Sequence, residues 1–277
     1  MANATSSSAA KGLVMVTSRP SDFSQEDDWA TWCGTCFAAT LLAILWAGPA
    51  RAQTEVDLHL IFAVDASGSV NQYRFELQKR GYVAALRNPK VLSAILGGRT
   101  QSIAVSLFQW TGPYLQVQVL PWMLLKNEAS IESAASLIES TPRKLFSGGT
   151  SISGAIDYSM GLFGQSPFKG ERRVIDISGD GSNNGGRSVV RARDEAVAKD
   201  VTINGLPILA VEPYLDQYFR DYVIGGAGAF MIVAETFEAF SDAILKKMIV
   251  EIASNDPPAQ SGRWRGQGGL MKERRGL

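Results

Sequence analysis

The residues best able to do chemistry lie in three short polar segments that are far apart in the chain. Asp65, Ser67 and Ser69 belong to the first, "DASGS", Thr150 to the second, "GGTS", and Asp180 to the third, "SGDGSNNGG". Their carboxylate and hydroxyl oxygens are hard donors, which suit Mg²⁺, Mn²⁺ or Ca²⁺ and not zinc or copper. If the fold brings the three segments together, the sequence predicts a divalent-cation site.

Each segment alone has a simpler structural explanation. Ser67 or Ser69 could cap the start of a helix, and so could Thr150. Asp180 followed by glycine is a common turn pair. These are the more frequent roles for single residues of these types, so the cation site depends on all three segments reaching one place.

The segments that precede the first and third polar groups are patterned as buried strands. In residues 56–64, "VDLHLIFAV", apolar side chains fall on both faces toward the end, which is typical of a central strand. Residues 172–178, "RRVIDIS", form a second strand pattern. Since ligands of open α/β sheets lie beyond the carboxyl ends of the strands, Asp65 and Asp180 are expected at one edge.

The rest of the chain alternates between strand and helix patterns, which predicts an α/β fold. Thr111-Gly112-Pro113 separates two strand patterns by a short turn, so we expect a hairpin whose second strand forms an edge of the sheet. The alternation elsewhere implies a mostly parallel sheet with right-handed crossovers and helices on both faces. Further strands are expected at 101–110, 114–122, 202–211 and 229–234, and helices at 70–88, 127–140, 150–163, 188–200 and 235–253.

Taken together, the three motifs resemble those of a known family. Asp-x-Ser-x-Ser after the first strand, a Thr in a Gly-Gly-Thr loop and an Asp in a Ser-Gly-Asp-Gly turn are similar to the metal-ion-dependent adhesion site (MIDAS) of the von Willebrand factor type A (VWA) domain. The resemblance covers roughly residues 55–253, and all five motif positions match. "VIDISGDGSNN" and "TINGLPI" also resemble a bacterial group of uncharacterised exported proteins built on this domain.

The resemblance implies a Rossmann-like, three-layer fold and a role for each motif residue. Ser67, Ser69 and Thr150 would supply hydroxyl oxygens to the ion, and Asp65 and Asp180 would supply carboxylates, often through bound water. Mg²⁺ held largely by neutral hydroxyls keeps much of its charge, and its shell of six oxygens leaves a position for a Glu or Asp of a partner protein. The expected function is therefore cation-dependent protein binding in adhesion or assembly, without catalysis.

Two other functions remain open at this point. A Mg²⁺-dependent hydrolase of the phosphoryl-transfer type also places an Asp after its first strand, but such enzymes resemble D-x-D, and Ser67 occupies the second position here. The single histidine, His59, is expected roughly 20 Å from Asp65 at about 3.3 Å per strand residue, so no strong general base is evident. The other alternative is a structural VWA module with an empty site.

The charge balance argues against a nucleic-acid partner. The chain has 27 Lys and Arg residues and 27 Asp and Glu residues, so it has no overall field that would attract nucleic acid or an anionic membrane. We therefore expect a protein partner, and contact with a membrane only through the N-terminal segment if that segment stays uncleaved.

The first part of the chain carries a signal-like segment. Residues 37–47, "FAATLLAILWA", are apolar but shorter than the ~20 residues that a membrane-spanning helix needs. Ala50-Arg51-Ala52 fits a signal-peptidase site, which predicts export to the periplasm or out of the cell and a mature start at Gln53. The acidic stretch before the apolar run indicates either a translation start downstream of Met1 or a short membrane anchor.

Composition divides the chain into three expected parts. Residues 1–52 form an N-terminal extension with the signal-like segment, 53–253 the VWA-like domain, and 254–277 a mildly basic tail. The tail is rich in Gly, Pro and Arg without an apolar period, so it is expected to be disordered. Cys33 and Cys36 form one C-x-x-C, which we interpret as incidental because a structural zinc site needs further ligands.

Overall fold

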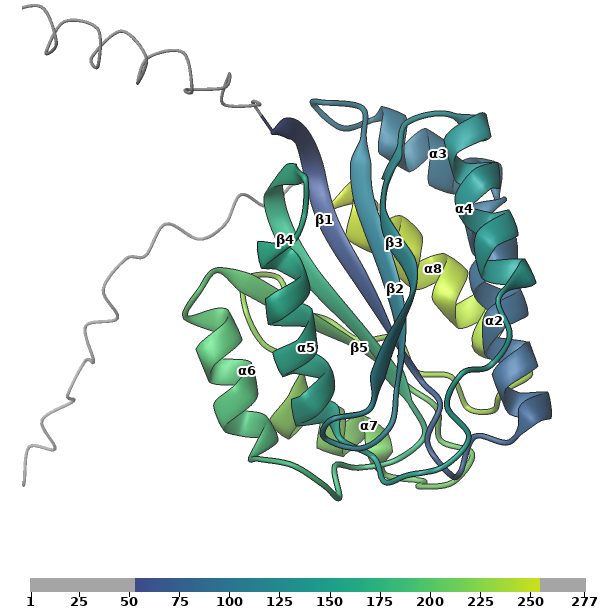
Figure 1. Cartoon of the computed structure of the whole chain (residues 1–277), viewed down its shortest axis with the longest axis vertical. Helices are drawn as coiled ribbons and strands as arrows, with labels where there is room; N and C mark the ends of the chain where they lie inside the picture. The colour runs from purple at the N-terminus through teal and green to yellow at the C-terminus, as the bar shows by residue number, and fades with distance from the viewer. Residues whose placement is uncertain (1–52, 255–277) are drawn as a thin grey trace, which may run out of the picture. The chain divides into compact units, whose positions relative to one another are not determined.

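The computed structural model describes residues 53–254, and a five-stranded sheet lies at their centre. The strands lie in the order β3-β2-β1-β4-β5 (Figure 1). β1 pairs in parallel with β2 and β4, β4 pairs in parallel with β5, and β2 pairs antiparallel with β3. This confirms the predicted sheet, mostly parallel with one antiparallel edge strand. The strands are β1 (Thr54–Asp65), β2 (Ile103–Trp110), β3 (Gln116–Leu125), β4 (Phe168–Gly179) and β5 (Val201–Pro207).

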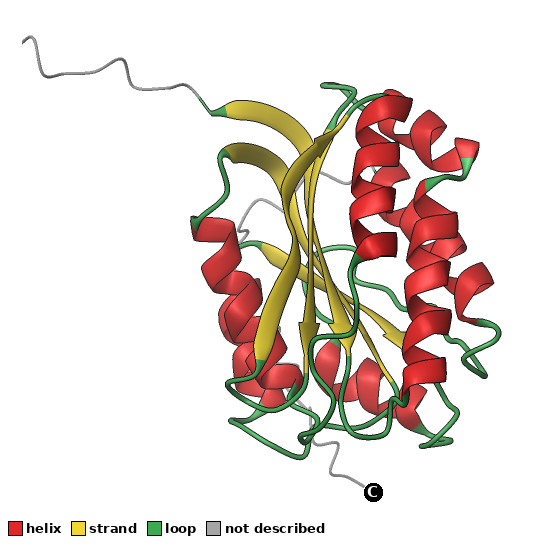
Figure 2. Cartoon of the chain, turned by 45° about the vertical axis from the view of Figure 1, so that its right-hand side comes forward, coloured by secondary structure: helices red, strands yellow, loops and turns green. Residues whose placement is uncertain are grey.

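Helices cover both faces of the sheet and complete a three-layer fold (Figure 2). One layer contains α2, α3, α4 and α8, and the other contains α5, α6, α7 and the π-helix η1. Each layer encloses its own hydrophobic core against the sheet. The helices are α2 (Gln72–Leu86), α3 (Pro89–Leu96), α4 (Glu128–Ser140), α5 (Ile152–Gly164), α6 (Val189–Val197), α7 (Leu215–Tyr218), η1 (Phe219–Val223) and α8 (Phe240–Ala253).

The central strand β1 contributes to both cores. Leu58 and Leu60 are buried in one core, and Ile61 and Ala63 in the other. Successive side chains of a strand point to opposite faces, so a strand covered on both sides needs a nearly continuous apolar run. Because β1 ends at Asp65, packing of the two cores fixes the position of the first polar segment.

The helix α3 was not predicted from the sequence, and neither were the short helices α7 and η1. α2 ends at Leu86, before Pro89, but Pro89 then begins the new helix α3. Asn88 caps α3 by accepting a hydrogen bond from the N–H of Lys90. Proline is favoured in the first turn of a helix because its missing N–H would have no partner there. The same proline thus closes one helical segment and opens the next.

The prediction of a strand at 229–234 is wrong, because these residues do not form one. The segment makes only isolated bridges to β5 and its end, at Met231 and Ala234. The side-chain Oδ1 of Asn204 in β5 accepts the N–H of Phe230 at 2.9 Å. Pro207 at the end of β5 has no N–H to donate. A regular hydrogen-bond ladder therefore does not form along this segment.

The closing helix is shorter than predicted. It was expected from residue 235, but α8 begins at Phe240. The residues before it form a turn in which the N–H of Ala239 donates to Thr236 Oγ1 at 3.3 Å. α8 still packs against α2 and α3, as a helix that completes one layer should.

Several predictions fall outside the described residues. These concern the signal-like segment 37–52, cleavage after Ala52, the Cys33 and Cys36 pair, and the tail beyond Ser254. Within residues 53–254, none of the helices has both the length and the apolar character needed to cross a bilayer.

Candidate metal centre

The carboxyl ends of β1 and β4 bring the first and third polar segments together. The two strands are parallel neighbours, with Val64 opposite Ser178 near their ends. The N–H of Asp180 donates to Oδ2 of Asp65 at 3.4 Å. Both aspartate side chains are fully buried. Two carboxylates therefore lie side by side at the sheet edge where the sequence pattern predicts them.

The two serines of the first segment connect these carboxylates. The N–H of Ser67 donates to Asp65 Oδ1 at 2.7 Å, which holds the loop against the end of the strand. The Oγ atoms of Ser67 and Ser69 lie 3.2 Å apart, and Ser69 Oγ donates to Asp180 Oδ1 at 2.6 Å. Four of the five predicted donors thus form one hydrogen-bonded set.

Thr150 reaches the same edge from the loop before α5. The N–H of Gly68 donates to the carbonyl oxygen of Gly148 at 3.3 Å. This bond joins the loop before α5 to residues 66–69, here called the serine loop. Gly181 follows Asp180, and a methyl group at Gly181 would lie 3.5 Å from Thr150 Oγ1. The structure therefore brings all five predicted residues to one edge, while their role as metal ligands stays a prediction.

The hydroxyl residues of the centre are not helix caps. Asn71 caps α2, and Ser151 caps α5, each through a side-chain oxygen that accepts a backbone N–H of the first turn. Capping therefore does not explain the presence of Ser67, Ser69 or Thr150 at this edge.

Burial makes the two carboxylates difficult to ionise without a cation nearby. Burial, and next the neighbouring charge of Asp180, raise the pKa of Asp65 to about 7. Burial also raises the pKa of Asp180, although the Ser69 hydrogen bond and the Arg74 charge oppose it. Within the described residues Asp180 Oδ2 accepts no hydrogen bond, and Arg74 Nη1 lies 3.7 Å from it. A dication between the two carboxylates would balance both charges, so these residues fit a metal ion.

Alcohol oxygens make up more than half of this donor set. Within residues 53–254, no group of three or more His, Cys, Asp or Glu side chains is placed to hold a metal. The candidate centre has only two carboxylates, and its other three side-chain donors are hydroxyls. Such a set of hard oxygens suits Mg²⁺, Mn²⁺ or Ca²⁺.

Two residues that the sequence interpretation missed hold the donor loops in place. Arg143 is buried, and its Nη2 donates to the carbonyl oxygens of Ala66 and Ser67 at 2.9 and 3.1 Å. Asn184 Oδ1 accepts the N–H of Thr150 at 2.8 Å. Asn184 belongs to the polar segment "SGDGSNNGG", so its sequence signal was visible. Arg143 lies in a loop with no pattern that marks it.

Glu212 places a third carboxylate beside the Asp180 turn. Its Oε1 accepts the backbone N–H and the hydroxyl of Ser182 at 3.0 and 3.2 Å. A methyl group at Gly181 would lie 3.4 Å from the same oxygen, so this carboxylate is close to the candidate centre. Because it is bonded to Ser182, Glu212 supports the turn rather than joining the connected donor set.

The single histidine of the chain, His59, lies away from the candidate metal centre. His59 is buried in the middle of β1, with Nε2 3.2 Å from Ser166 Oγ and its ring 4.9 Å from that of Trp122. Burial, and then the charge of Arg173, lower the pKa of His59 to about 4, so the ring is neutral near pH 7. This environment is a packing site, and the ring makes no contact with the Asp65 edge within the described residues.

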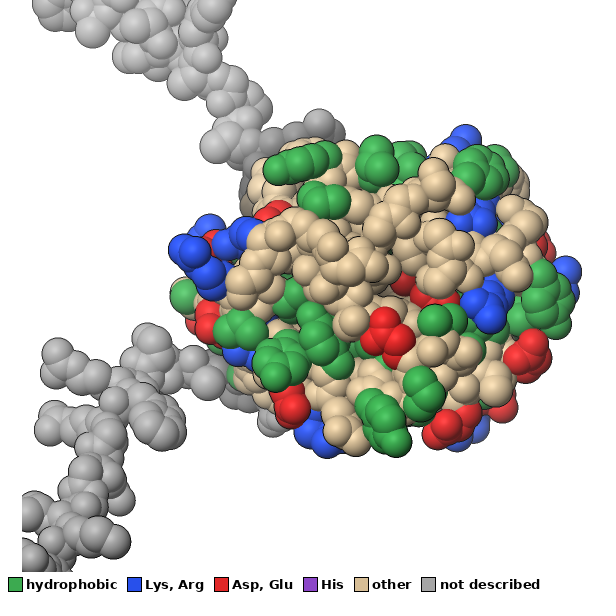
Figure 3. Space-filling view, turned by 90° about the horizontal axis from the view of Figure 1, so that it is seen from below, with side chains coloured by type: hydrophobic (Ala, Val, Ile, Leu, Met, Phe, Trp, Pro, Cys, Tyr) green, Lys and Arg blue, Asp and Glu red, His purple; other side chains and the backbone are tan. Residues whose placement is uncertain are grey.

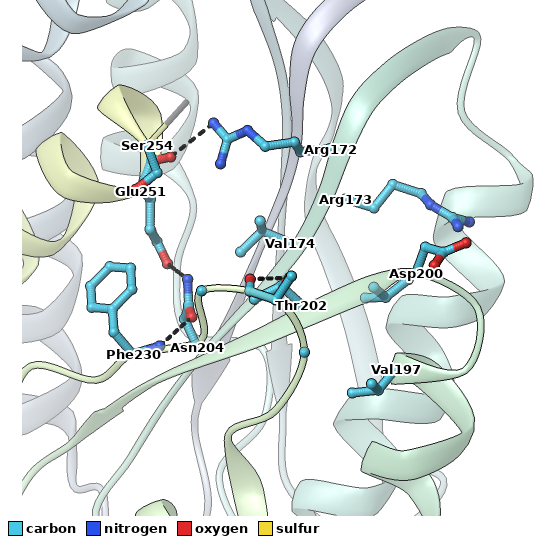
Figure 4. A pocket seen from close by; sticks show the side chains of 14 residues that line it. Arg172, Arg173, Val174, Val197, Asp200, Thr202, Asn204, Phe230, Glu251 and Ser254 are labelled. Atoms are coloured by element: carbon cyan, nitrogen blue, oxygen red, sulfur yellow. Dashed lines mark hydrogen bonds between the residues drawn. The ribbon is translucent and has the colours of Figure 1, made fainter. Parts of the chain in front are cut away.

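A hollow of about 200 Å³ lies between the middle of β4 and the amino end of β5, away from the candidate metal centre (Figure 4). In its wall the side chain of Glu251 reaches Asn204, whose Nδ2 donates to Glu251 Oε1 at 3.0 Å. Asn204 Oδ1 in turn accepts the N–H of Phe230 at 2.9 Å. These bonds connect α8 to β5 and to the irregular segment after it. None of the five predicted donors lines this hollow.

Comparison with known proteins identifies a family and a fold. The family described as "Protein of unknown function (DUF1194)" matches residues 55–256. No match was found among curated proteins.

Several solved structures have a similar fold. Proximal thread matrix protein 1 from the mussel byssus, with a zinc-occupied MIDAS motif, is 17% identical with a TM-score of 0.52, over 73% of this chain and 49% of its own. A von Willebrand factor type A structure from Catenulispora acidiphila is 15% identical with a TM-score of 0.51. The match covers 72% of this chain and 43% of that one. A mutant of the PilB minor pilin from Streptococcus sanguinis is 12% identical with a TM-score of 0.53. The match covers 74% of this chain and 63% of the pilin chain.

Identities of this size show a shared fold. The chain therefore has the VWA fold that the sequence motifs implied. It spans about half of the length of the first two proteins and less than two thirds of the third.

Proposed function

We propose that the function of this chain is cation-dependent protein binding. The chain belongs to the family described as "Protein of unknown function (DUF1194)" and has the VWA fold. The observation that carries the proposal is a pair of buried carboxylates joined to two serine hydroxyls at the ends of adjacent parallel strands. The residues that would hold the ion are Asp65, Ser67, Ser69, Thr150 and Asp180.

Each donor has a role that follows from its position. Asp65 and Asp180 would balance the charge of the ion from buried positions, directly or through water. Ser67, Ser69 and Thr150 would fill further positions without adding negative charge. When bound, the ion supplies a positively charged centre that accepts a carboxylate oxygen from a Glu or Asp of a partner protein.

Relatives of the fold support this role and leave the choice of metal to experiment. The mussel protein has zinc in its MIDAS motif, which shows that a divalent ion occupies that motif in one protein of this fold. Hard oxygen donors in this chain favour Mg²⁺, with Mn²⁺ or Ca²⁺ as alternatives. A byssus matrix protein and a minor pilin share the fold, which supports a role in adhesion or assembly.

We also propose that the domain acts outside the cytoplasm, in the periplasm or as a secreted protein. The support is the signal-like segment 37–52 with its cleavage pattern after Ala52. The division into an extension of residues 1–52, a domain of residues 53–253 and a tail belongs to the same proposal.

The two alternatives predict different results. A hydrolase of the phosphoryl-transfer type would turn over a generic phosphate ester, and Asp65→Ala would abolish that turnover. The surroundings of His59 give no support to this alternative, because its ring is engaged with Ser166 and Trp122. A structural module with an empty site would show no response to divalent metal at all.

Thermal unfolding tests the proposal. Because a ligand that binds the folded state stabilises it by mass action, Mg²⁺ or Mn²⁺ at ~100 times its Kd should add about 2.7 kcal/mol to the free energy of unfolding. For a domain of this size that corresponds to a rise in Tm of roughly 5–10 °C. Excess EDTA should reverse the rise, and Asp65→Ala should remove it. An unchanged Tm at millimolar metal would contradict the proposal.

A further inference from the structure

Four aromatic rings are the most exposed large hydrophobic side chains in residues 53–254. Tyr73, Tyr114, Phe146 and Tyr214 are 61%, 94%, 67% and 74% exposed. Exposed apolar side chains scattered singly are normal, but apolar groups gathered on one face mark interaction sites. The position of these four residues, here called the aromatic frame, is therefore informative.

Two residues of the frame lie next to arginines that bind the serine loop of the candidate metal centre. Tyr73 lies in the first turn of α2, and its neighbour Arg74 donates from Nη1 to the carbonyl oxygen of Ser69 at 2.8 Å. The ring of Phe146 lies 5.4 Å from the guanidinium of Arg143. That same guanidinium donates to the carbonyl oxygen of Ser67, as described above.

The other two residues of the frame lie close in the chain to residues that contact the second and third donor segments. Tyr114 lies in the turn between β2 and β3, where the carbonyl oxygen of Thr111 accepts the N–H of Ser151 at 2.8 Å, next to Thr150. Tyr214 immediately precedes α7 and lies two residues after Glu212, whose carboxylate holds the Asp180 turn through Ser182. Each donor segment thus has an exposed aromatic residue close to a residue that holds it in place.

The four frame residues belong to segments that follow β1, connect β2 to β3, precede α5 and precede α7, and these segments lie at the carboxyl edge of the sheet. Figure 3 looks onto this edge of the sheet and shows separate hydrophobic patches around a middle region that contains acidic side chains. At ~150–250 Å² for each aromatic side chain, the exposed parts of the four rings amount to roughly 400–700 Å². One side of a typical protein interface covers ~800 Å², so this surface has the size of a protein contact rather than of a small ligand.

We propose that the aromatic frame binds a polypeptide segment with a single carboxylate flanked by apolar side chains. This inference rests on the proposed function, because the carboxylate would bind the ion while the flanking side chains pack on the rings. Charge supports apolar flanks: Glu238 accepts the Tyr73 hydroxyl at 3.5 Å, and Glu212 lies close to Tyr214 in the chain. These carboxylates repel a run of acidic residues, whereas Arg74 adds positive charge beside the centre.

Short fluorescent peptides with defined sequences test the inference. One peptide carries a central Glu with Phe and Leu on its two sides, a second carries the same Glu with Ser on both sides, and a third replaces Glu by Gln between apolar flanks. Fluorescence anisotropy measures their binding to the full chain in Mg²⁺ and in EDTA. Since burial of each apolar side chain is favourable, the apolar-flanked Glu peptide should bind at least about tenfold more tightly than the Ser-flanked one.

Variants locate that preference on the frame. Tyr114→Ser combined with Tyr214→Ser should reduce the preference for apolar flanks to about threefold or less, while the Tm response to Mg²⁺ stays that of the parent. Leu96→Ser is the matched control, because Leu96 is 43% exposed and ends α3, which precedes the amino end of β2 and so lies away from the carboxyl edge. This control should keep the full preference.

The outcomes separate the inference from the proposed function. Equal affinity for the two Glu peptides, no binding of either to Mg²⁺-loaded protein, or an unchanged preference in the double tyrosine variant would each overturn the aromatic frame as the contact surface. Binding that neither EDTA nor the Gln replacement weakens would instead overturn the role of the ion while leaving the frame in place.

Discussion

At Ser67 and Ser69 the chain has alcohols where carboxylates would hold a cation more tightly. Further carboxylates would neutralise more of the ion's charge and leave less attraction for a partner's carboxylate. Here only two buried carboxylates, Asp65 and Asp180, would oppose the charge of the ion, and the serines connect the two without adding negative charge. The types of residue at the edge thus favour an ion that still attracts an anion.

Substitution of single donors tests their assignment. Ser67→Ala and Thr150→Ala should weaken Mg²⁺ binding by about tenfold with the fold intact, since each removes one neutral donor, and Asp65→Ala should weaken it further because a balancing charge is lost. Isothermal titration calorimetry measures these affinities. Ser159→Ala is the matched control, because Ser159 is buried in α5 and donates only to the carbonyl oxygen of Ala155 among the described residues. Parental affinity in all three donor variants would show that the ligands are other residues.

Arg143 offers a test of loop positioning. Its Nη2 bonds to two carbonyl oxygens of the serine loop, a geometry that the single ammonium group of lysine does not reproduce. Arg143→Lys should therefore weaken Mg²⁺ binding by about tenfold, the loss typical of groups that orient metal ligands. Arg87→Lys, at an exposed arginine paired with Glu132 and Glu139, should leave the affinity unchanged. Equal affinity in both variants would mean that the serine loop keeps its shape without the Arg143 contacts.

At this scale the sequence identifies donors better than it identifies their supports. Asp65, Ser67 and Ser69 could be predicted because a short polar motif follows a strongly apolar strand. Arg143 could not be predicted, because it acts on backbone carbonyl oxygens, which leave no mark in the sequence. Asp176, a carboxylate within an apolar strand, gave no indication of its partner, which the structure shows to be Lys247.

Among the elements, α8 is attached to the sheet through buried charges. Lys247 Nζ lies 2.7 Å from Asp176 Oδ1 on β4 and donates to Glu251 one turn later in α8. All three side chains are buried. Burial first, and then the charge of Glu251, raise the pKa of Asp176 to about 7 in spite of the nearby ammonium group. Burial first, and then the Asp176 charge, also raise the pKa of Tyr82, which approaches from α2.

Removal of Lys247 and removal of Asp176 should have different consequences. Lys247→Met leaves two buried carboxylates without a cation and should lower the free energy of unfolding by ~3–5 kcal/mol in urea denaturation. Asp176→Asn leaves a neutral pair of Lys247 and Glu251, so its effect should be smaller and should depend on pH. Lys246→Met is the control for the first variant, because Lys246 is the exposed neighbour on the same helix. A loss below 1 kcal/mol in Lys247→Met, on the order of the control's, would show that water reaches these charges.

The direction of that pH dependence follows from the raised pKa of Asp176. The folded state holds this proton more tightly than the unfolded chain, so its contribution to stability falls as the pH rises from the ordinary range of an aspartate toward about 7. Asp176→Asn removes this loss and should therefore gain on the parent between about pH 5 and pH 8, by on the order of 1 kcal/mol. Urea unfolding of the parent and of Asp176→Asn, in EDTA at about pH 5 and about pH 8, measures this difference in the free energy of unfolding. A constant difference would mean that Asp176 stays ionised throughout.

Long, strongly patterned elements could be predicted, whereas irregular ones could not. The apolar run of β1 and the alternation of β3 are unambiguous, and both strands form. The apolar segment 229–234 resembles a strand in composition, but a side chain of β5 and the missing N–H of Pro207 interrupt its pairing. Pro89 marked a helix boundary correctly, yet the sequence alone did not show that a new helix begins there.

For the whole molecule, strand order decides whether a site exists. β1 and β4 are separated in the chain by six helical or strand elements, yet they are neighbours in the sheet, and this places Asp65 beside Asp180. The alternation of patterns predicts a parallel sheet but not which strands are adjacent, because pairing depends on contacts between distant segments. Resemblance of the motifs to the VWA domain supplied that information. The partner stays a proposal for the same reason, since no local pattern encodes it. The native location stays a proposal because the signal-like segment that suggests it lies outside the described residues.

The most direct measurement is anomalous X-ray diffraction from crystals of the protein grown with Mn²⁺. We expect the strongest anomalous peak at the carboxyl edge of the sheet, within bonding distance of oxygens from the serine loop and Thr150, with Asp65 and Asp180 bound directly or through water. Crystals with no peak at that edge, or with manganese held only by residues elsewhere in the domain, would contradict it.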